Sequence, residues 1–136
     1  MRHPIIIVCA PDDWLANQLR ELVADRRWLL KLIRRPAAMP DLVPCVLLVQ
    51  IDVHEATPEM FALLASARTA NPDATAIAVI DTKVADEDKA AWTASLFDLG
   101  CRLVLFPPLT RPVIEDAVSG LMEAVIQRGM PDKAAT

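Results

Sequence analysis

The residues best placed for chemistry lie at the end of an apolar run from Cys45 to Ile51. Gln50 is the penultimate residue of this run, and Asp52 and His54 follow shortly after it. An apolar run of this length between turn signals is typical of a buried strand, and ligands of open α/β sheets bind just beyond the carboxyl ends of such strands. The turn after this strand is therefore where we expect a site.

Histidine, cysteine and glycine patterns give little support to other chemistries. The only histidines are His3 and His54, and neither has a partner in view for a catalytic triad or a zinc site. We expect His54 to be solvated. The three cysteines lack metal-ligand spacing, so we expect buried thiols at Cys9, Cys45 and Cys101. With three glycines and no glycine-rich phosphate loop, the sequence predicts no cofactor and no enzyme active site of a common class.

Composition limits the partners and the compartment. Hydrophobic residues make up 54% of the 136 residues and charged residues 24%, yet no apolar run approaches the length of a membrane span. The first apolar run is too short for a signal peptide, which predicts a cytoplasmic protein with no membrane partner. A net charge of -4 and a pI of about 5.1 argue against nucleic-acid binding. The basic residues between Arg20 and Arg35 are expected to form a solvated edge rather than a partner surface.

Apolar runs and turn residues predict five strands that alternate with helices. The strands are expected at 4–9, 28–33, 45–51, 76–80 and 103–106. The first helix should begin with Asp12 as N-cap and Asp13 in its first turn, and end near Asp25. A short or irregular helix is expected at 37–42, between prolines. Thr57 should cap a helix from Pro58 to Ala70, and a further helix should end before Gly100. The last helix is expected at 111–127, with Thr110 as its N-cap.

The alternation of strands and helices predicts a parallel sheet in one α/β domain. Each right-handed crossover between parallel strands needs its own helix, and a chain of this length supplies about one helix per strand. The strand at 45–51 should be central, and the one at 28–33, which has basic flanks, should be an edge. We expect one domain over residues 1–129 and a flexible tail over residues 130–136.

Two local features accompany the order of elements. Gly100 precedes the fifth strand, and the stretch from Leu105 to Leu109 reads Leu-Phe-Pro-Pro-Leu. In these features the chain resembles the receiver domain of bacterial two-component response regulators. The resemblance implies a doubly wound, flavodoxin- and CheY-like (βα)5 fold, with a five-stranded parallel sheet in the order 2-1-3-4-5. It also implies a protein partner in a signalling pathway or phosphorelay.

The resemblance also implies where a phosphorylation site would lie. Receiver domains carry an acidic pair after the first strand, a phosphoacceptor aspartate at the third, a Thr or Ser at the fourth and a Lys before the proline after the fifth. The matching residues here are Cys9, Ala10, Gln50, Asp81 and Pro107. Gln50 offers no nucleophilic carboxylate, and Cys9 and Ala10 offer no acidic pair for magnesium. Pro107 offers no ammonium for a phosphoryl group. We therefore expect a non-enzymatic pseudo-receiver that acts through protein contacts.

Two alternatives remain open at this site. In a shifted register, Asp52 would be the phosphoacceptor, and Asp12 or Asp13 would hold the metal. Asp81 would then be a residual acid, although a carboxylate at the start of a loop more often caps the next helix. A third possibility is that a small molecule binds in the crevice beyond Cys9 and Gln50.

The last predicted helix is apolar over more of its circumference than one sheet face requires. Its apolar side chains spread over roughly 220° at 100° per residue. The excess predicts a flank buried against a second copy of the chain, as in receiver homodimers, although a helix set deeply into its own domain would show the same pattern. The candidate interface residues are Trp92, Val118, Met122, Val125 and Ile126.

Overall fold

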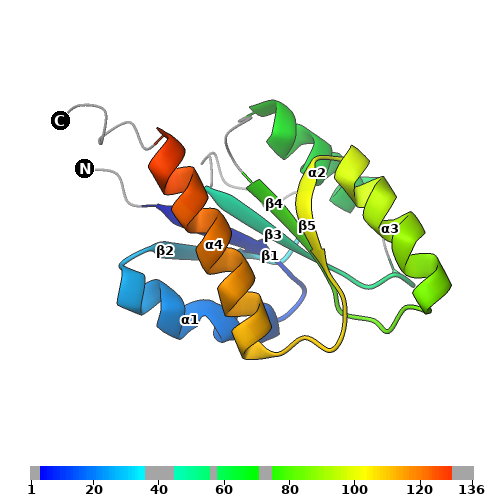
Figure 1. Ribbon diagram of the computed structural model, residues 1–136, viewed down its shortest axis with the longest axis horizontal. Helices are drawn as coiled ribbons and strands as arrows, with labels where there is room; N and C mark the ends of the chain where they lie inside the picture. Colours follow the sequence, from blue (N-terminus) through cyan, green and yellow to red (C-terminus); the bar gives the residue numbers. More distant parts are fainter. Residues whose placement is uncertain (1–3, 36–44, 56–57, 71–74, 130–136) are drawn as a thin grey trace.

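The described residues of the protein form five strands and four helices (Figure 1). The structure, a computed structural model, describes residues 4–35, 45–55, 58–70 and 75–129. The elements are β1 (Ile5–Cys9), α1 (Trp14–Arg26), β2 (Leu29–Ile33), β3 (Val46–Ile51), α2 (Pro58–Ala70), β4 (Thr75–Ile80), α3 (Asp86–Asp98), β5 (Cys101–Leu105) and α4 (Arg111–Gly129). The helix expected at 37–42, the cap at Thr57 and the tail at 130–136 lie outside the described residues.

The strands form one parallel sheet in the order β2-β1-β3-β4-β5, which confirms the predicted doubly wound α/β fold. Its central strand, β3, is buried along its whole length, as the apolar run predicted. The pairing of β3 with β4 sets Gln50 beside Val79 and Ile51 beside Ile80. The ends of β3 and β4 therefore reach the same edge of the sheet, and residues that follow them can meet there.

Helices cover both faces of the sheet, α1 and α4 on one face and α2 and α3 on the other (Figure 1). Alternate residues of each strand point to opposite faces, so Ile6 and Val8 pack toward α1 and α4, whereas Ile7 and Cys9 pack toward α2 and α3. Burial of a large aliphatic side chain contributes about 1.5–3 kcal/mol, so the two cores hold the strand ends in fixed positions. Along the described residues, none of the helices combines the length and apolar character needed to cross a membrane.

Helix α1 begins one residue later than predicted. The N-cap position is occupied by Asp13 rather than Asp12, and Asp13 makes no side-chain capping bond. Its carboxylate instead lies 2.5 Å from the guanidinium of Arg34. Asp12 precedes the cap, and its Oδ1 accepts a hydrogen bond of 3.0 Å from the backbone N–H of Trp14, an Asx-type turn.

The fifth strand also has different bounds from those expected. It begins at Cys101 and ends at Leu105, whereas the apolar pattern predicted 103–106. Cys101 pairs with Ala76 of β4, with a register shift directly after this pair. Gly100 links α3 to this strand with a φ of 104°, a conformation that side-chain-bearing residues rarely adopt. The glycine therefore permits the turn that the sequence indicated.

The residues proposed for an interface on the last helix pack within the chain itself. Val118 and Met122 are fully buried, and Val125 is almost so. Ile126 is partly buried against the same core, and Trp92 is partly buried against the core on the opposite face of the sheet. Val118, Met122 and Val125 therefore have no surface to offer to a second chain.

The extra apolar width of α4 is explained by its position between the sheet and α1. Figure 1 shows α1 and α4 side by side over one face of the sheet. Arg111 pairs with Glu21, and Arg26 pairs with Glu123 at 2.7 Å, so ion pairs join the C-terminal half of α1 to the start and to the last third of α4. The large apolar side chain that α4 leaves exposed is Val113, at 44%. The second flank of the helix is thus covered by α1 within the same chain.

Candidate functional site

The carboxyl edge of the sheet brings together the positions that the sequence singled out. Cys9 ends β1 and Ala10 follows it, Gln50 is the penultimate residue of β3, and Asp81 directly follows β4. Pro107 lies in the loop after β5. Parallel strands end at one edge, so residues far apart in sequence line common cavities there. The turn after β3 therefore borders one of these cavities through Asp52.

Gln50 and Asp81 form the polar centre of this edge. Gln50 is only 4% exposed, and its Nε2 donates a hydrogen bond of 2.6 Å to Oδ2 of Asp81. A carboxylate only accepts hydrogen bonds, so the amide nitrogen must face Asp81 and Oε1 must point away from it. Oε1 is buried and has no hydrogen-bond partner in the described structure. Leaving a buried polar atom unpaired lowers the stability of the fold by about 1–3 kcal/mol, so this oxygen is an unusual feature. A hydrogen-bond donor from a ligand would remove that cost.

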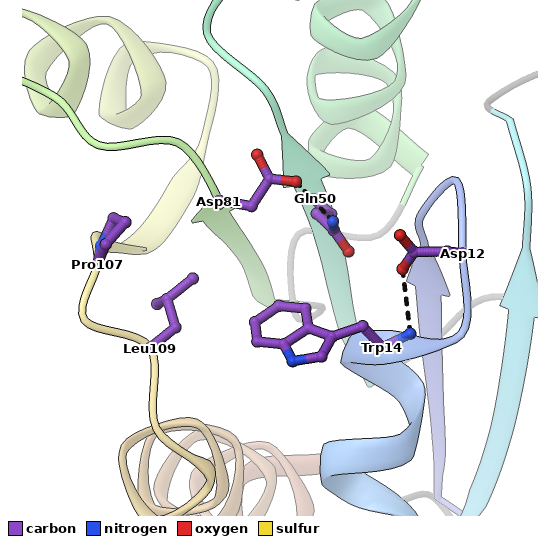
Figure 2. Close-up of a pocket in the computed structure, with 6 residues that line it drawn as sticks. All are labelled: Asp12, Trp14, Gln50, Asp81, Pro107 and Leu109. Atoms are coloured by element: carbon purple, nitrogen blue, oxygen red, sulfur yellow. Dashed lines mark hydrogen bonds between the residues drawn. The ribbon is translucent and has the colours of Figure 1, made fainter.

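A cavity of about 290 Å³ opens beside this amide (Figure 2). Carboxylates contribute its charge, because Asp12 and Asp81 line it and no basic side chain does so among the described residues. Figure 2 shows the Trp14 ring below the Gln50 amide, with Pro107 on the side of Asp81 and Asp12 on the opposite side. The full lining is Asp12, Trp14, Gln50, Asp81, Pro107 and Leu109.

A second cavity of about 440 Å³ shares Gln50 and Asp81 with the first. Cys9 and Ala10 also line this cavity, and so does Asp52, together with basic and acidic side chains from the neighbouring loops. The five positions that match the phosphorylation site of receivers are thus divided between two adjoining cavities.

Asp52, the alternative phosphoacceptor, is held in the turn after β3. Its Oδ1 accepts hydrogen bonds from the hydroxyl of Thr82 at 3.1 Å and from the backbone N–H of His54 at 2.9 Å. The Thr82 oxygen in turn accepts a hydrogen bond from the backbone of Val53. The carboxylate therefore organises the turn, and His54 is exposed, as predicted.

The acids proposed as metal ligands in that alternative are engaged elsewhere. Asp13 pairs with Arg34, and Asp12 caps the backbone of Trp14. Asp12 lines the smaller cavity and Asp52 the larger one, so the two carboxylates do not share a cavity. Within the described ranges, no group of three or more His, Cys, Asp or Glu side chains is arranged to hold a metal ion.

The buried thiols of Cys9 and Cys101 are poorly suited to act as nucleophiles or metal ligands. Burial raises the pKa of Cys9 to about 11 and that of Cys101 to about 12. Both side chains therefore carry a proton at neutral pH, and the thiolate that attacks electrophiles or binds metals is scarce. The prediction of buried thiols is confirmed for Cys9 and Cys101, whereas Cys45 is half-buried.

Three residues of this edge were not anticipated from the sequence. Trp14 and Leu109 form apolar walls of the smaller cavity, and Thr82 fixes Asp52. Trp14 directly follows Asp13 and is the first residue of α1. Its position at the start of the helix that follows β1 was the feature of the sequence that could have placed it at this edge. Leu109 ends the proline-containing stretch after β5, and Thr82 gave no signal beyond its position after Asp81.

Solved receiver structures share this fold, although no family model and no curated protein matches the sequence. A CheY-like response regulator receiver domain protein from Methanospirillum hungatei has a TM-score of 0.72 at 12% identity, over 94% of this chain and 100% of that one. A response regulator from Thermotoga maritima has a TM-score of 0.67 at 13% identity, over 90% and 99%. A putative pilus assembly-related protein from Burkholderia pseudomallei has a TM-score of 0.66 at 18% identity, over 88% and 90%. At these identities the likeness establishes the fold.

Proposed function

We propose that this chain is a pseudo-receiver, a signalling or regulatory module that has lost aspartyl phosphorylation and acts by binding a protein partner. The receiver fold supports the signalling role, since solved receiver domains superpose on nearly the whole chain. The unusual sheet edge supports the loss of phosphorylation. On this proposal, residues 1–129 form the functional domain.

The observation that carries the proposal is the environment of Gln50. In the receiver pattern this position holds the phosphoacceptor carboxylate, whereas here an amide nitrogen donates to Asp81 at 2.6 Å. An amide is a poor nucleophile, and attack by an aspartate carboxylate is what forms the acyl phosphate of a receiver. The hydrogen bond also directs the amide nitrogen, rather than a nucleophilic oxygen, toward the neighbouring strand.

The charge around the smaller cavity supports the same conclusion. A transferred phosphoryl group is strongly anionic, and catalysis of its transfer depends on cations that neutralise the developing charge. Asp12 and Asp81 would repel it, and Pro107 stands where the receiver pattern has a lysine. The described lining of this cavity therefore disfavours a phosphoryl group.

Phosphorylation of Asp52 is the alternative, and the larger cavity that Asp52 shares with Asp81 is what favours it. It requires a metal ion beside a carboxylate that already accepts bonds from Thr82 and His54. We rank it second, because the acids proposed to hold that metal lie in the other cavity or pair with an arginine.

Incubation with acetyl phosphate and magnesium tests the proposal. Intact-protein mass spectrometry should show no added phosphoryl group, while a phosphorylatable receiver treated in parallel gains one. A mass increase that is lost in the Asp52→Asn variant but kept in Asp25→Asn would establish the alternative. Asp25 is a suitable control because it is an exposed aspartate at the far end of α1.

The partner is expected to be a protein of the same signalling pathway, and a second copy of the chain is the simplest case. The helices before and after β5 in the sequence each carry an exposed apolar side chain, Phe97 on α3 at 48% and Val113 on α4 at 44%. Light scattering of the purified protein distinguishes the cases. A dimer that Val113→Asp or Phe97→Asp dissociates would make the partner a second copy, and a monomer would make it a different protein.

A further inference from the structure

We propose that the cavity of about 290 Å³ beside Gln50 binds the guanidinium group of an arginine side chain presented by the protein partner. The inference rests on the proposed function, since it names the chemistry by which a module without phosphorylation would recognise its partner. The proposed ligand is cationic, whereas the phosphoryl group expected at a receiver site is anionic.

The cavity carries negative charge. Asp12 and Asp81 both line it, and neither takes part in any ion pair between described residues. Among the described residues, the partners of Asp81 are uncharged: the Gln50 amide and the Thr82 hydroxyl, whose single proton it shares with Asp52. Within the same ranges, Asp12 accepts only from a backbone N–H. Two carboxylates without a cation face a common space, so a positively charged ligand would gain from both of them.

The side-chain oxygen of Gln50 is a second feature, which does not depend on charge. Its oxygen is an acceptor in a side chain that is 96% buried, and it has no donor. The bond to Asp81 fixes the amide so that this oxygen cannot be exchanged for the nitrogen by a flip. Figure 2 shows the amide between Asp81 and Asp12, with Oε1 on the side away from Asp81. A ligand N–H that displaces the atoms now covering this oxygen would supply the missing donor.

The shape and the apolar wall of the cavity also suit an arginine side chain. The half-buried ring of Trp14 and the side chains of Pro107 and Leu109 complete the lining. An indole face attracts a cation placed over it, most strongly when water is displaced. A volume of about 290 Å³ lies at the lower end of ligand sites, which suits one long side chain better than a cofactor.

These features together favour guanidinium over ammonium. A guanidinium group is planar, stacks on aromatic rings and carries five N–H donors in a fixed fork. Its five donors therefore match a cavity lined by two carboxylates and an amide, and its plane matches the ring of Trp14. An ammonium has three donors and no plane, so it would satisfy fewer of these acceptors.

Titration with the capped tripeptide acetyl-Gly-Arg-Gly-amide, followed by proton–nitrogen NMR, tests the inference. We expect saturable shifts of the Gln50 side-chain amide and the Trp14 indole N–H, with a dissociation constant in the millimolar range. The lysine peptide should bind more weakly, and the citrulline peptide, which keeps the shape but not the charge, should not bind. Free arginine and ethylguanidinium are titrated in parallel. If either binds more tightly than the arginine peptide, the natural ligand is a small molecule and not a side chain of a protein partner.

Two variants and one control locate the site. Asp81→Asn and Asp12→Asn should each weaken binding of the arginine peptide by at least about fivefold, and Asp25→Asn should leave it unchanged. Circular dichroism confirms that each variant is folded, and Asp12→Asn, at an exposed position, keeps the test valid if Asp81→Asn unfolds. Absence of shifts at Gln50 and Trp14, equal binding of the citrulline peptide, or binding unaffected by both variants would overturn the inference. The acetyl phosphate experiment reads out separately, so a failure of this inference can be distinguished from a failure of the proposed function.

Discussion

The side-chain nitrogen of Gln50 lies 2.6 Å from a carboxylate oxygen of Asp81, across the ends of the neighbouring strands β3 and β4. This bond satisfies one half of a buried amide and leaves the other half, Oε1, without a donor. Most buried polar groups in proteins are paired, so this edge of the sheet carries an energetic cost that the other buried side chains of the described residues avoid. Such local costs occur where a surface is kept for binding.

Replacement of Gln50 by methionine measures that cost. Gln50→Met keeps the volume, removes the bond to the exposed Asp81, and removes the unpaired oxygen at the same time. The two effects oppose each other, so we expect the free energy of unfolding to stay within about 1 kcal/mol of the wild-type value. Gln50→Ala leaves a cavity and should lose about 2–4 kcal/mol. Urea denaturation measures both variants, and a loss above about 2 kcal/mol in Gln50→Met would mean that Oε1 has a partner in solution.

The inward face of α4 predicts a sharp contrast between two of its residues. Met122 is fully buried between the sheet and α1, and Val113 is 44% exposed on the same helix. Met122→Ala should lower the free energy of unfolding by about 2–5 kcal/mol, because it removes buried contacts and leaves a void. Val113→Ala should change it by less than about 0.5 kcal/mol. Equal effects in urea denaturation would show that the helix is rotated relative to this description.

The sheet could be predicted from the sequence because its signal is local. The runs at β3 and β4 are apolar at nearly every position, which is the pattern of strands covered on both faces. Residues after those strands must then meet at one edge, so Gln50 and Asp81 could be placed near each other. Their hydrogen bond and the unpaired oxygen depend on side-chain packing and could not be read in advance.

Long-range contacts explain where the sequence predictions were wrong. Arg34, which is 21 residues from Asp13, takes that carboxylate away from the helix start and leaves Asp12 to bond the backbone. The apolar width of α4 showed how much of the helix is buried but not what covers it. The covering element is α1, whose ion pair between Glu21 and Arg111 spans 90 residues of sequence.

The ion pair between Glu21 and Arg111 predicts a pH dependence of stability. A hydrogen bond from Arg111, together with its positive charge, lowers the pKa of Glu21 below its ordinary value. A lowered folded-state pKa means that the pair stabilises the fold above the unfolded-state pKa of about 4.3 and stops doing so as the pH falls through the folded-state value. Glu21→Gln should therefore be less stable than wild type at pH 7, and the difference should vanish at low pH.

Urea midpoints of both proteins across this pH range provide the measurement. Both side chains are largely exposed, at 42% for Arg111 and 74% for Glu21, so the difference should be small and should shrink in high salt. Glu55→Gln, at an exposed position in the loop after β3, serves as the control and should follow the wild-type curve. A difference that grows toward low pH would contradict the assignment.

Two glycines should respond in opposite directions to the same substitution. Gly100 has a φ of 104° between α3 and β5, where an added Cβ would be strained, so Gly100→Ala should lower the free energy of unfolding by about 1–2 kcal/mol. Gly120 lies in the middle of α4, exposed, and a Cβ built there has no heavy atom within 4 Å. Gly120→Ala should therefore raise the free energy of unfolding by about 0.5–1 kcal/mol, because alanine restricts the unfolded chain and favours a helix. Each variant is the control for the other in thermal or urea unfolding. A stabilising Gly100→Ala would place the turn before β5 at a negative φ, and a destabilising Gly120→Ala would mean that another surface packs on α4 at that position.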